Sequence, residues 1–186
     1  MAAFQAMPAG RVYLVPFLMS AGYVLHDGIP AALGAALRDP RLTVCRPVGE
    51  GPHLTRIIAA RAAQACVRQG LAAAETVLLL IGHGTPRDPQ SRDAARAQAA
   101  RLTADRQFAA VVTGFLDDAP DVGAALGSIE GRACVAVGLF ADAGPHGEAD
   151  ARAALAPGGN AVHYAGAIGP DPARVEIILD QVRAAV

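Results

Sequence analysis

The 186-residue chain contains no tryptophan and no lysine, and only 4% of its residues are aromatic. Its 16 basic residues, all arginines, are balanced by 17 acidic ones, so the formal net charge is −1. This balance argues against nucleic acid as a partner, because nucleic-acid-binding proteins usually present a basic face. No apolar run approaches the roughly 18 residues that span a bilayer, and the N-terminus lacks a basic region followed by an apolar one. We therefore expect a cytoplasmic protein that does not bind membranes.

Cysteine and the common catalytic motifs are equally scarce. Cys45, Cys66 and Cys134 show no C-x-x-C spacing, and an odd number in such a chain argues against a disulfide framework. Each lies among apolar residues, which is typical of a small buried hydrophobic residue. The chain has no G-x-S-x-G elbow, no G-x-x-x-x-G-K-[ST] phosphate loop and no G-x-G-x-x-G fingerprint. An activated serine nucleophile and a dinucleotide site are therefore not indicated.

What the chain does have is an alternation of apolar strands and alanine-rich helices. With 53% hydrophobic residues and a mean hydropathy of +0.31, it is typical of a compact globular protein. Strands are predicted at 11–20, 41–48, 76–84, 109–116, 133–141 and 161–168, and helices at 28–38, 53–69, 89–104, 119–128, 146–156 and 171–185. The strands are apolar nearly throughout. This pattern predicts an α/β fold of parallel sheets with helices on both faces.

An internal repeat divides the chain. Residues 11–69 resemble 134–185, since "VYLVPFLMSAG" matches "VAVGLFADAG" and "GEGPHLTRII" matches "GPDPARVEII". We interpret 1–70 as a half-module of two β-α units and 75–186 as a complete module of four. The segment "QGLAAAE" (69–75) is the expected junction.

Three polar groups follow predicted strands of the complete module. They are His83 in "LLLIGHGTPRDP", Asp117 and Asp118 in "GFLDDAP", and His146 in "ADAGPHGEAD". Each has a simpler reading, as a turn residue for His83, a helix N-cap before a proline for the aspartates, and a solvent-facing cap for His146. Ligands bind at the carboxyl ends of parallel strands, so their coincidence at one edge favours a single site. Imidazole ligates cobalt, nickel, iron or zinc and also accepts protons near neutrality.

The segments that carry these groups resemble a known family. "LLLIGHGTPRDPQSRDAARAQAARL", "VVTGFLDDAPDVGAAL", "VAVGLFADAGPHGEADARAAL" and "YAGAIGPDP" together look like the class II, ATP-independent chelatases of the CbiX type. These are the sirohydrochlorin cobalto- or ferrochelatases of cobalamin and sirohaem biosynthesis. The resemblance covers nearly all of 75–186. It implies a chelatase-like fold and insertion of a divalent metal, Co²⁺ first and Fe²⁺ or Ni²⁺ as alternatives, into sirohydrochlorin or a related tetrapyrrole without a nucleotide.

The resemblance also assigns roles to residues. His83 and His146 would form the catalytic pair that binds the metal and abstracts protons at the mouth of a tetrapyrrole cleft. Asp117 stands where the family usually has a glutamate, as a proton acceptor or ligand that reaches about one methylene less. Because the substrate is a polycarboxylate, Arg87 and Arg92 are candidates to clamp its side arms.

Residues 1–70 depart from the family pattern. Tyr23 occupies the position near which a catalytic histidine would fall, His26 is offset, and His53 is expected to begin a helix. We therefore expect this half to lack a site of its own. Two parallel strands leave an open edge, so the chain is predicted to form a homodimer through residues 11–69.

Two other functions stay open at this point. A histidine phosphatase also carries His-Gly after a strand, but it needs an arginine immediately before the histidine, where this chain has Gly82. A non-catalytic metal or tetrapyrrole carrier would use the same ligands without inserting the metal.

Overall fold

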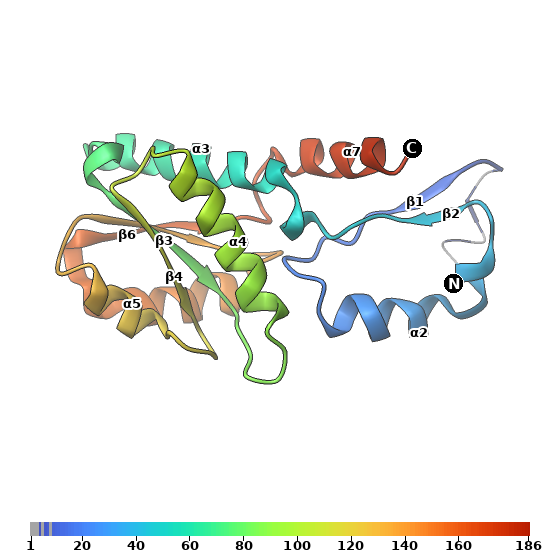
Figure 1. Ribbon diagram of the computed structural model, residues 1–186, viewed down its shortest axis with the longest axis horizontal. Helices are drawn as coiled ribbons and strands as arrows, with labels where there is room; N and C mark the ends of the chain where they lie inside the picture. Colours follow the sequence, from blue (N-terminus) through green and yellow to red (C-terminus); the bar gives the residue numbers. More distant parts are fainter. Residues whose placement is uncertain (1–3, 5, 8) are drawn as a thin grey trace.

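The structure is a computed structural model that describes residues 4, 6, 7 and 9–186, and it contains two parallel sheets (Figure 1). In the small sheet, β1 (Val12–Leu14) pairs with β2 (Leu42–Val44). The large sheet has the order β4-β3-β5-β6, formed by β3 (Val77–Gly82), β4 (Ala110–Phe115), β5 (Cys134–Gly138) and β6 (Val162–Ala167). All six expected strands are present, and the α/β class with parallel sheets is confirmed.

Helical segments follow the strands in the order that the periodicity predicted. They are α2 (Ile29–Leu33), α3 (Pro52–Gln69), α4 (Gln90–Ala104), α5 (Val122–Ser128), α6 (Ala151–Leu155) and α7 (Arg174–Ala184). Shorter helical turns include η1 (Val24–Gly28), η2 (Gly34–Arg38), η3 (Val48–Glu50) and η5 (His146–Asp150). His53 is the second residue of α3, as expected. Across the described residues, we find no helix with the length and apolarity needed to cross a membrane.

The helix expected at 28–38 is broken into three short pieces. Pro30 lacks a backbone N–H, and Gly34 adopts φ +51°, a conformation that does not continue an α-helix. The repeat partner of this segment, expected at 146–156, is likewise divided into η5 and α6. Alanine content alone therefore overestimated the regularity of both segments.

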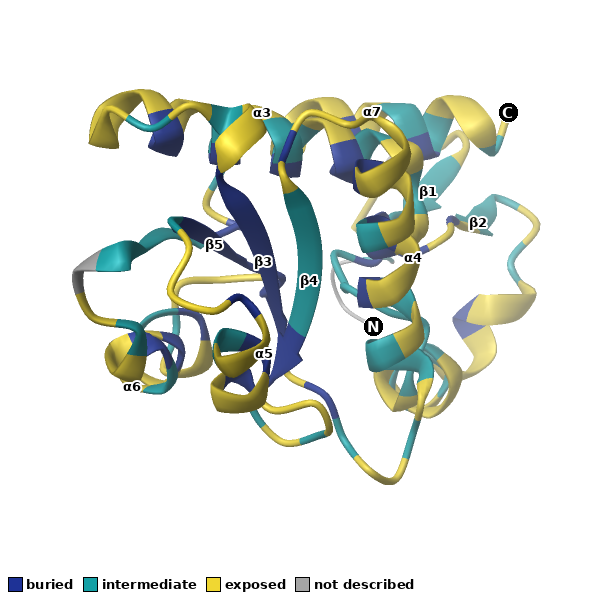
Figure 2. Cartoon of the chain, turned by 60° about the vertical axis from the view of Figure 1, so that its left-hand side comes forward, coloured by how far each residue is buried: buried dark blue, intermediate teal, exposed yellow. Residues whose placement is uncertain are grey.

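The two central strands of the large sheet, β3 and β5, are buried throughout (Figure 2), whereas most residues of β4 and β6 are half-buried. Leu78 and Leu80 of β3 pack on the face that α3 and α4 cover. Leu79 and Ile81 point to the opposite face, beneath α5 and α6. This alternation explains why β3 is apolar throughout, because neither of its faces meets water.

The small sheet is shorter than expected. The segments at 11–20 and 41–48 run side by side, with the amide of Cys45 donating to Leu14 at 2.9 Å and that of Gly49 to Leu18 at 2.9 Å. Only three residues of each segment form a regular ladder. Pro16 and Pro47 have no N–H to donate, so regular pairing stops there.

The last helix of each part of the chain packs against the other part. Helix α3, which follows β2, packs on β5 and β6 of the large sheet, whereas α7, which follows β6, contacts η3 and α3 (Figure 1). Leu54 and Ile58 of α3 lie in the same apolar cluster as Leu78. Residues 1–70 and 75–186 thus supply separate sheets but share one core. A boundary near residue 70 stays a prediction.

Candidate active site

The order of the large sheet places a crevice between β3 and β5. After β3 the chain passes through α4 to β4 on one side, and after β5 it passes through α6 to β6 on the other. In open parallel sheets, ligands bind at such a switch point, outside the carboxyl ends of the strands. His83 follows β3 and His146 lies on the loop and turn after β5. Their ring centroids are 4.6 Å apart, with the rings tilted by 41°.

The two glycines around His83 are required by packing. A Cβ atom on Gly82 would lie 3.0 Å from the ring of Phe115. Gly84 has φ +72°, and a Cβ atom there would lie 2.6 Å from the Cβ of Asp118. The glycines therefore make the tight turn possible, and the same turn leaves the His83 side chain 47% exposed at the end of a fully buried strand.

Asp117 is brought to His83 by the register of β3 and β4. Gly82 pairs with Phe115, and the pairing continues for two residues because the carbonyl of His83 accepts the amide of Asp117 at 2.9 Å. The Oδ2 atom of Asp117 then lies 3.2 Å from Nδ1 of His83. Neither Asp117 nor its neighbour caps α5, since the N-cap is Asp121, whose carboxylate accepts the amide of Ala124 at 2.6 Å.

His146 has a carboxylate partner that sequence reasoning missed. It begins η5, and its Nδ1 atom lies 2.8 Å from Oδ2 of Asp150. The spacing of four residues was the available signal, because side chains at i and i+4 meet on one face of a helix. Both imidazoles therefore face a carboxylate with the same ring nitrogen.

This arrangement favours metal ligation through the other nitrogen. When a carboxylate accepts the Nδ1–H proton, neutral imidazole keeps the lone pair on Nε2 for a metal ion. His146 and Asp117 are 56% and 62% exposed, so an ion can reach the pair from solvent. Within the described part of the chain, no three His, Cys, Asp or Glu side chains are placed together to hold a metal. The two imidazoles are therefore the candidate ligands that the structure brings together.

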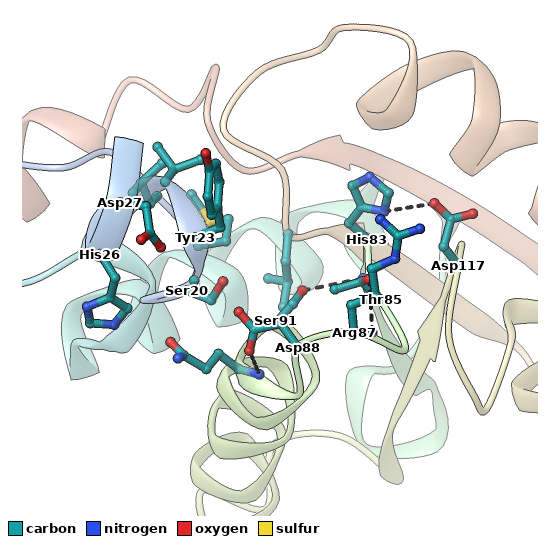
Figure 3. Close-up of a pocket in the computed structure, with 17 residues that line it drawn as sticks. Ser20, Tyr23, His26, Asp27, His83, Thr85, Arg87, Asp88, Ser91 and Asp117 are labelled. Carbon is teal, nitrogen blue, oxygen red and sulfur yellow. Dashed lines mark hydrogen bonds and ion pairs between the residues drawn. The ribbon is translucent and has the colours of Figure 1, made fainter. Parts of the chain in front are cut away.

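A cleft of about 860 Å³ opens beside His83 and Asp117 (Figure 3). Its opposite wall comes from the N-terminal part of the chain, which contributes Leu18, Met19, Ser20, Gly22, Tyr23, Val24, His26 and Asp27. Tyr23 is 73% exposed. The part expected to lack its own site thus supplies one side of this one, a role that only the packing of the two parts reveals.

The two candidate arginines have different surroundings. Arg87 lines the cleft on the loop after His83. Arg92 does not line it, because its guanidinium donates to both carboxylate oxygens of Asp118 at 3.0 and 3.2 Å. Asp118 is 7% exposed and sits beneath Gly84, so this ion pair supports the turn that carries His83.

Comparison with known proteins places these features in a family. The CbiX family model matches residues 1–65 and 77–185. A Halobacterium salinarum protein named "Probable sirohydrochlorin cobaltochelatase" is 24% identical over 213 residues, which cover 95% of this chain and 73% of that protein.

Solved structures agree with this match. The structure of CbiX described as the terminal enzyme of sirohaem biosynthesis in denitrifying bacteria has a TM-score of 0.80 and 30% identity, over 97% of this chain and 81% of that one. SirB from Bacillus subtilis, solved with Fe³⁺, has a TM-score of 0.77 at 20% identity, over 99% of this chain and 74% of that one, and so shows the fold alone. The chain therefore belongs to the CbiX family.

Proposed function

We propose that this protein inserts a divalent metal ion into sirohydrochlorin or a closely related tetrapyrrole without a nucleotide. The observation that carries the proposal is the pair of imidazoles, with centroids 4.6 Å apart and each Nδ1 facing a carboxylate, of which His83 lines a cleft of about 860 Å³. Cobalt is the first metal to test, since a curated relative is named a cobaltochelatase. Iron and nickel are the alternatives.

The geometry supports a division of labour in this reaction. The macrocycle must lose two pyrrole protons while the hydrated ion loses water. His83 and His146 would replace water on the ion through Nε2 and pass it to the ring nitrogens. Asp117, 3.2 Å from His83, would orient that imidazole and accept protons that leave the ring. Its short side chain suffices for the contact with His83, because the strand register already brings its backbone alongside.

The exposure of the two imidazoles favours transfer over storage. A carrier holds its cargo best with a closed set of ligands, whereas this site offers two imidazoles that remain about half exposed. Ligands this open to solvent would let the ion leave for the macrocycle. If the absorbance spectrum changes when the tetrapyrrole binds but never becomes that of the metallated product, the protein is instead a carrier.

The test is an insertion assay with the purified chain. Sirohydrochlorin and Co²⁺, Fe²⁺ or Ni²⁺ are mixed under anaerobic conditions without nucleotide, and formation of the metallated product is followed by absorbance. We expect His83→Ala and His146→Ala each to lower the rate by about 100-fold or more, because each removes a metal ligand. Near-normal rates in either variant, with the fold intact by circular dichroism, would overturn the proposal.

The two arginines are expected to have different roles, Arg87 in substrate binding and Arg92 in support of the site. Arg87→Ala is expected to raise KM for the tetrapyrrole with little change in kcat, because Arg87 lines the cleft and can reach a carboxylate side arm. Arg92 was also a candidate clamp, but its guanidinium is bound to Asp118. Arg92→Ala should therefore lower the melting temperature more than Arg87→Ala does.

We also propose that the protein associates as a homodimer through its small sheet. β1 and β2 pair only with each other among the described strands, and Val44 of β2 is 39% exposed. An open strand edge is a template for pairing with another chain. Light scattering at tens of micromolar is expected to give twice 18.9 kDa, and a monomer would refute this.

A further inference from the structure

A tyrosine of β6 reaches the turn that carries His146. The hydroxyl of Tyr164 donates to the carbonyl of Gly147 at 2.6 Å, and Gly147 directly follows His146. The two groups lie seventeen residues apart, and the bond joins β6 to η5. None of the roles described above uses this tyrosine.

Glycines on both sides make this contact possible. A Cβ atom on Gly138 would overlap the hydroxyl of Tyr164. A Cβ atom on Gly147 would overlap the carbonyl of Asp142 and lie 3.1 Å from the Cβ of Ala167. The backbone at Gly147 is therefore seated against three neighbours, one of which is the tyrosine.

The outer side of the turn is held by charged groups. Arg152 lies over the ring of Tyr164, with its guanidinium carbon 5.3 Å from the ring centroid, and it also bonds to Glu148. Asp150, on the same turn, faces Nδ1 of His146 at 2.8 Å. The tyrosine thus contacts the turn that fixes both His146 and its carboxylate partner.

The hydroxyl keeps its proton under all ordinary conditions. Burial, followed by the nearby charge of Glu148, raises the pKa of Tyr164 to about 12. It therefore remains a hydrogen-bond donor to the Gly147 carbonyl across the whole range in which imidazole titrates.

From these contacts we infer that Tyr164 is a positioning residue for metal transfer, whose hydroxyl fixes the backbone at Gly147 and thereby directs the imidazole of His146 toward His83. The inference rests on the proposed function of this site. A group that orients a metal-binding histidine from outside the coordination shell typically changes metal affinity or activity by about 10- to 100-fold when it is removed. Here Tyr164 acts through the main chain at Gly147 and not through the imidazole ring.

The test is Tyr164→Phe, which removes only the oxygen. Co²⁺ alone is titrated into the protein by calorimetry, and insertion kinetics are measured against each substrate. We expect Co²⁺ binding to weaken about 10-fold, KM for the metal to rise by a similar factor, and KM for the tetrapyrrole to stay unchanged. Tyr13→Phe, the same change on β1, is the matched control and should have no effect on any of these.

Three outcomes would overturn the inference. They are wild-type Co²⁺ affinity in Tyr164→Phe, an equal rise in KM for both substrates, and a further loss of Co²⁺ affinity when Tyr164→Phe is added to His146→Ala. If Tyr164→Phe does not fold, Arg152→Ala, which removes the outer contact of the ring, must weaken Co²⁺ binding in the same direction. If the wild type binds Co²⁺ but inserts none, the proposed function fails while the titration still decides the role of Tyr164.

Discussion

Gln98 of α4 connects the two parts of the chain through a buried amide. It is 1% exposed, its Oε1 atom accepts the hydroxyl of Thr55 at 2.5 Å, and its Nε2 atom donates to the carbonyls of Gly49 at 2.7 Å and Gly51 at 3.2 Å. Gly49 in turn donates its amide to Leu18, which lines the cleft. Changing Gln98 should therefore affect both stability and the cleft wall.

The expected loss for Gln98→Ala can be worked from these bonds. A buried polar group left without a partner costs about 1–3 kcal/mol. The Thr55 hydroxyl can turn to the carbonyl four residues earlier, so the Gly49 carbonyl is the main orphan, and the lost side-chain packing adds to its cost. We therefore expect the free energy of unfolding to fall by roughly 2–4 kcal/mol. For a chain of this length that corresponds to a melting temperature lower by roughly 5–15 °C.

Two companion variants test the reasoning by calorimetry. Thr55→Val removes one bond and should cost about half as much, and the double variant should cost less than the sum because the two residues share that bond. Gln98→Glu should be worse than alanine at neutral pH, because a buried carboxylate would face the Gly49 carbonyl. Burial raises the pKa of such a carboxyl group above its value of about 4.3 in the unfolded chain. The variant is therefore most stable below that pH and loses stability as pH rises.

The result that would refute this reasoning is a melting temperature of Gln98→Ala within about 2 °C of the wild type. That outcome would mean that the Gly49 carbonyl finds another partner, and that the amide does not join the two parts. A Gln98→Glu variant whose melting temperature relative to the wild type does not improve on acidification would equally contradict the burial argument.

Three further predictions concern the site and the core. Gly84→Ala should lower the free energy of unfolding by about 1–2 kcal/mol or more, because alanine is strained at φ +72° and its Cβ would meet Asp118. The same change should lower the insertion rate. Gly127→Ala, at a helical glycine with open space around it, is the control for both measurements. Burial raises the pKa of the Cys134 thiol to about 12, so stability should fall as pH rises from about 9 toward 12; thermal unfolding of Cys134→Ala should show a shallower alkaline decline. Insertion should slow on acidification, because a protonated imidazole cannot bind a metal ion; a rate that is unchanged from pH 8 down to pH 5 would contradict this.

Much of the fold follows from local sequence. The six strands could be predicted because each is an apolar run bounded by glycine or proline. The chain order of strand and helix then dictated parallel pairing. The three cysteines were expected to be buried, and all three are buried and free. Placing His83 and His146 at one sheet edge needed only the rule that parallel strands end together, because both follow strands of the same sheet.

Tertiary structure decided what surrounds those histidines. No local pattern indicates that Tyr164 contacts the turn after His146, that Arg92 is bound to Asp118 instead of facing the cleft, or that residues near Tyr23 form the opposite wall. These contacts join residues far apart in the chain, and each depends on strand register or on how the two parts of the chain pack together. Side-chain periodicity records which face of an element is buried but not which partner covers it, so the completed site exists only once the chain has folded.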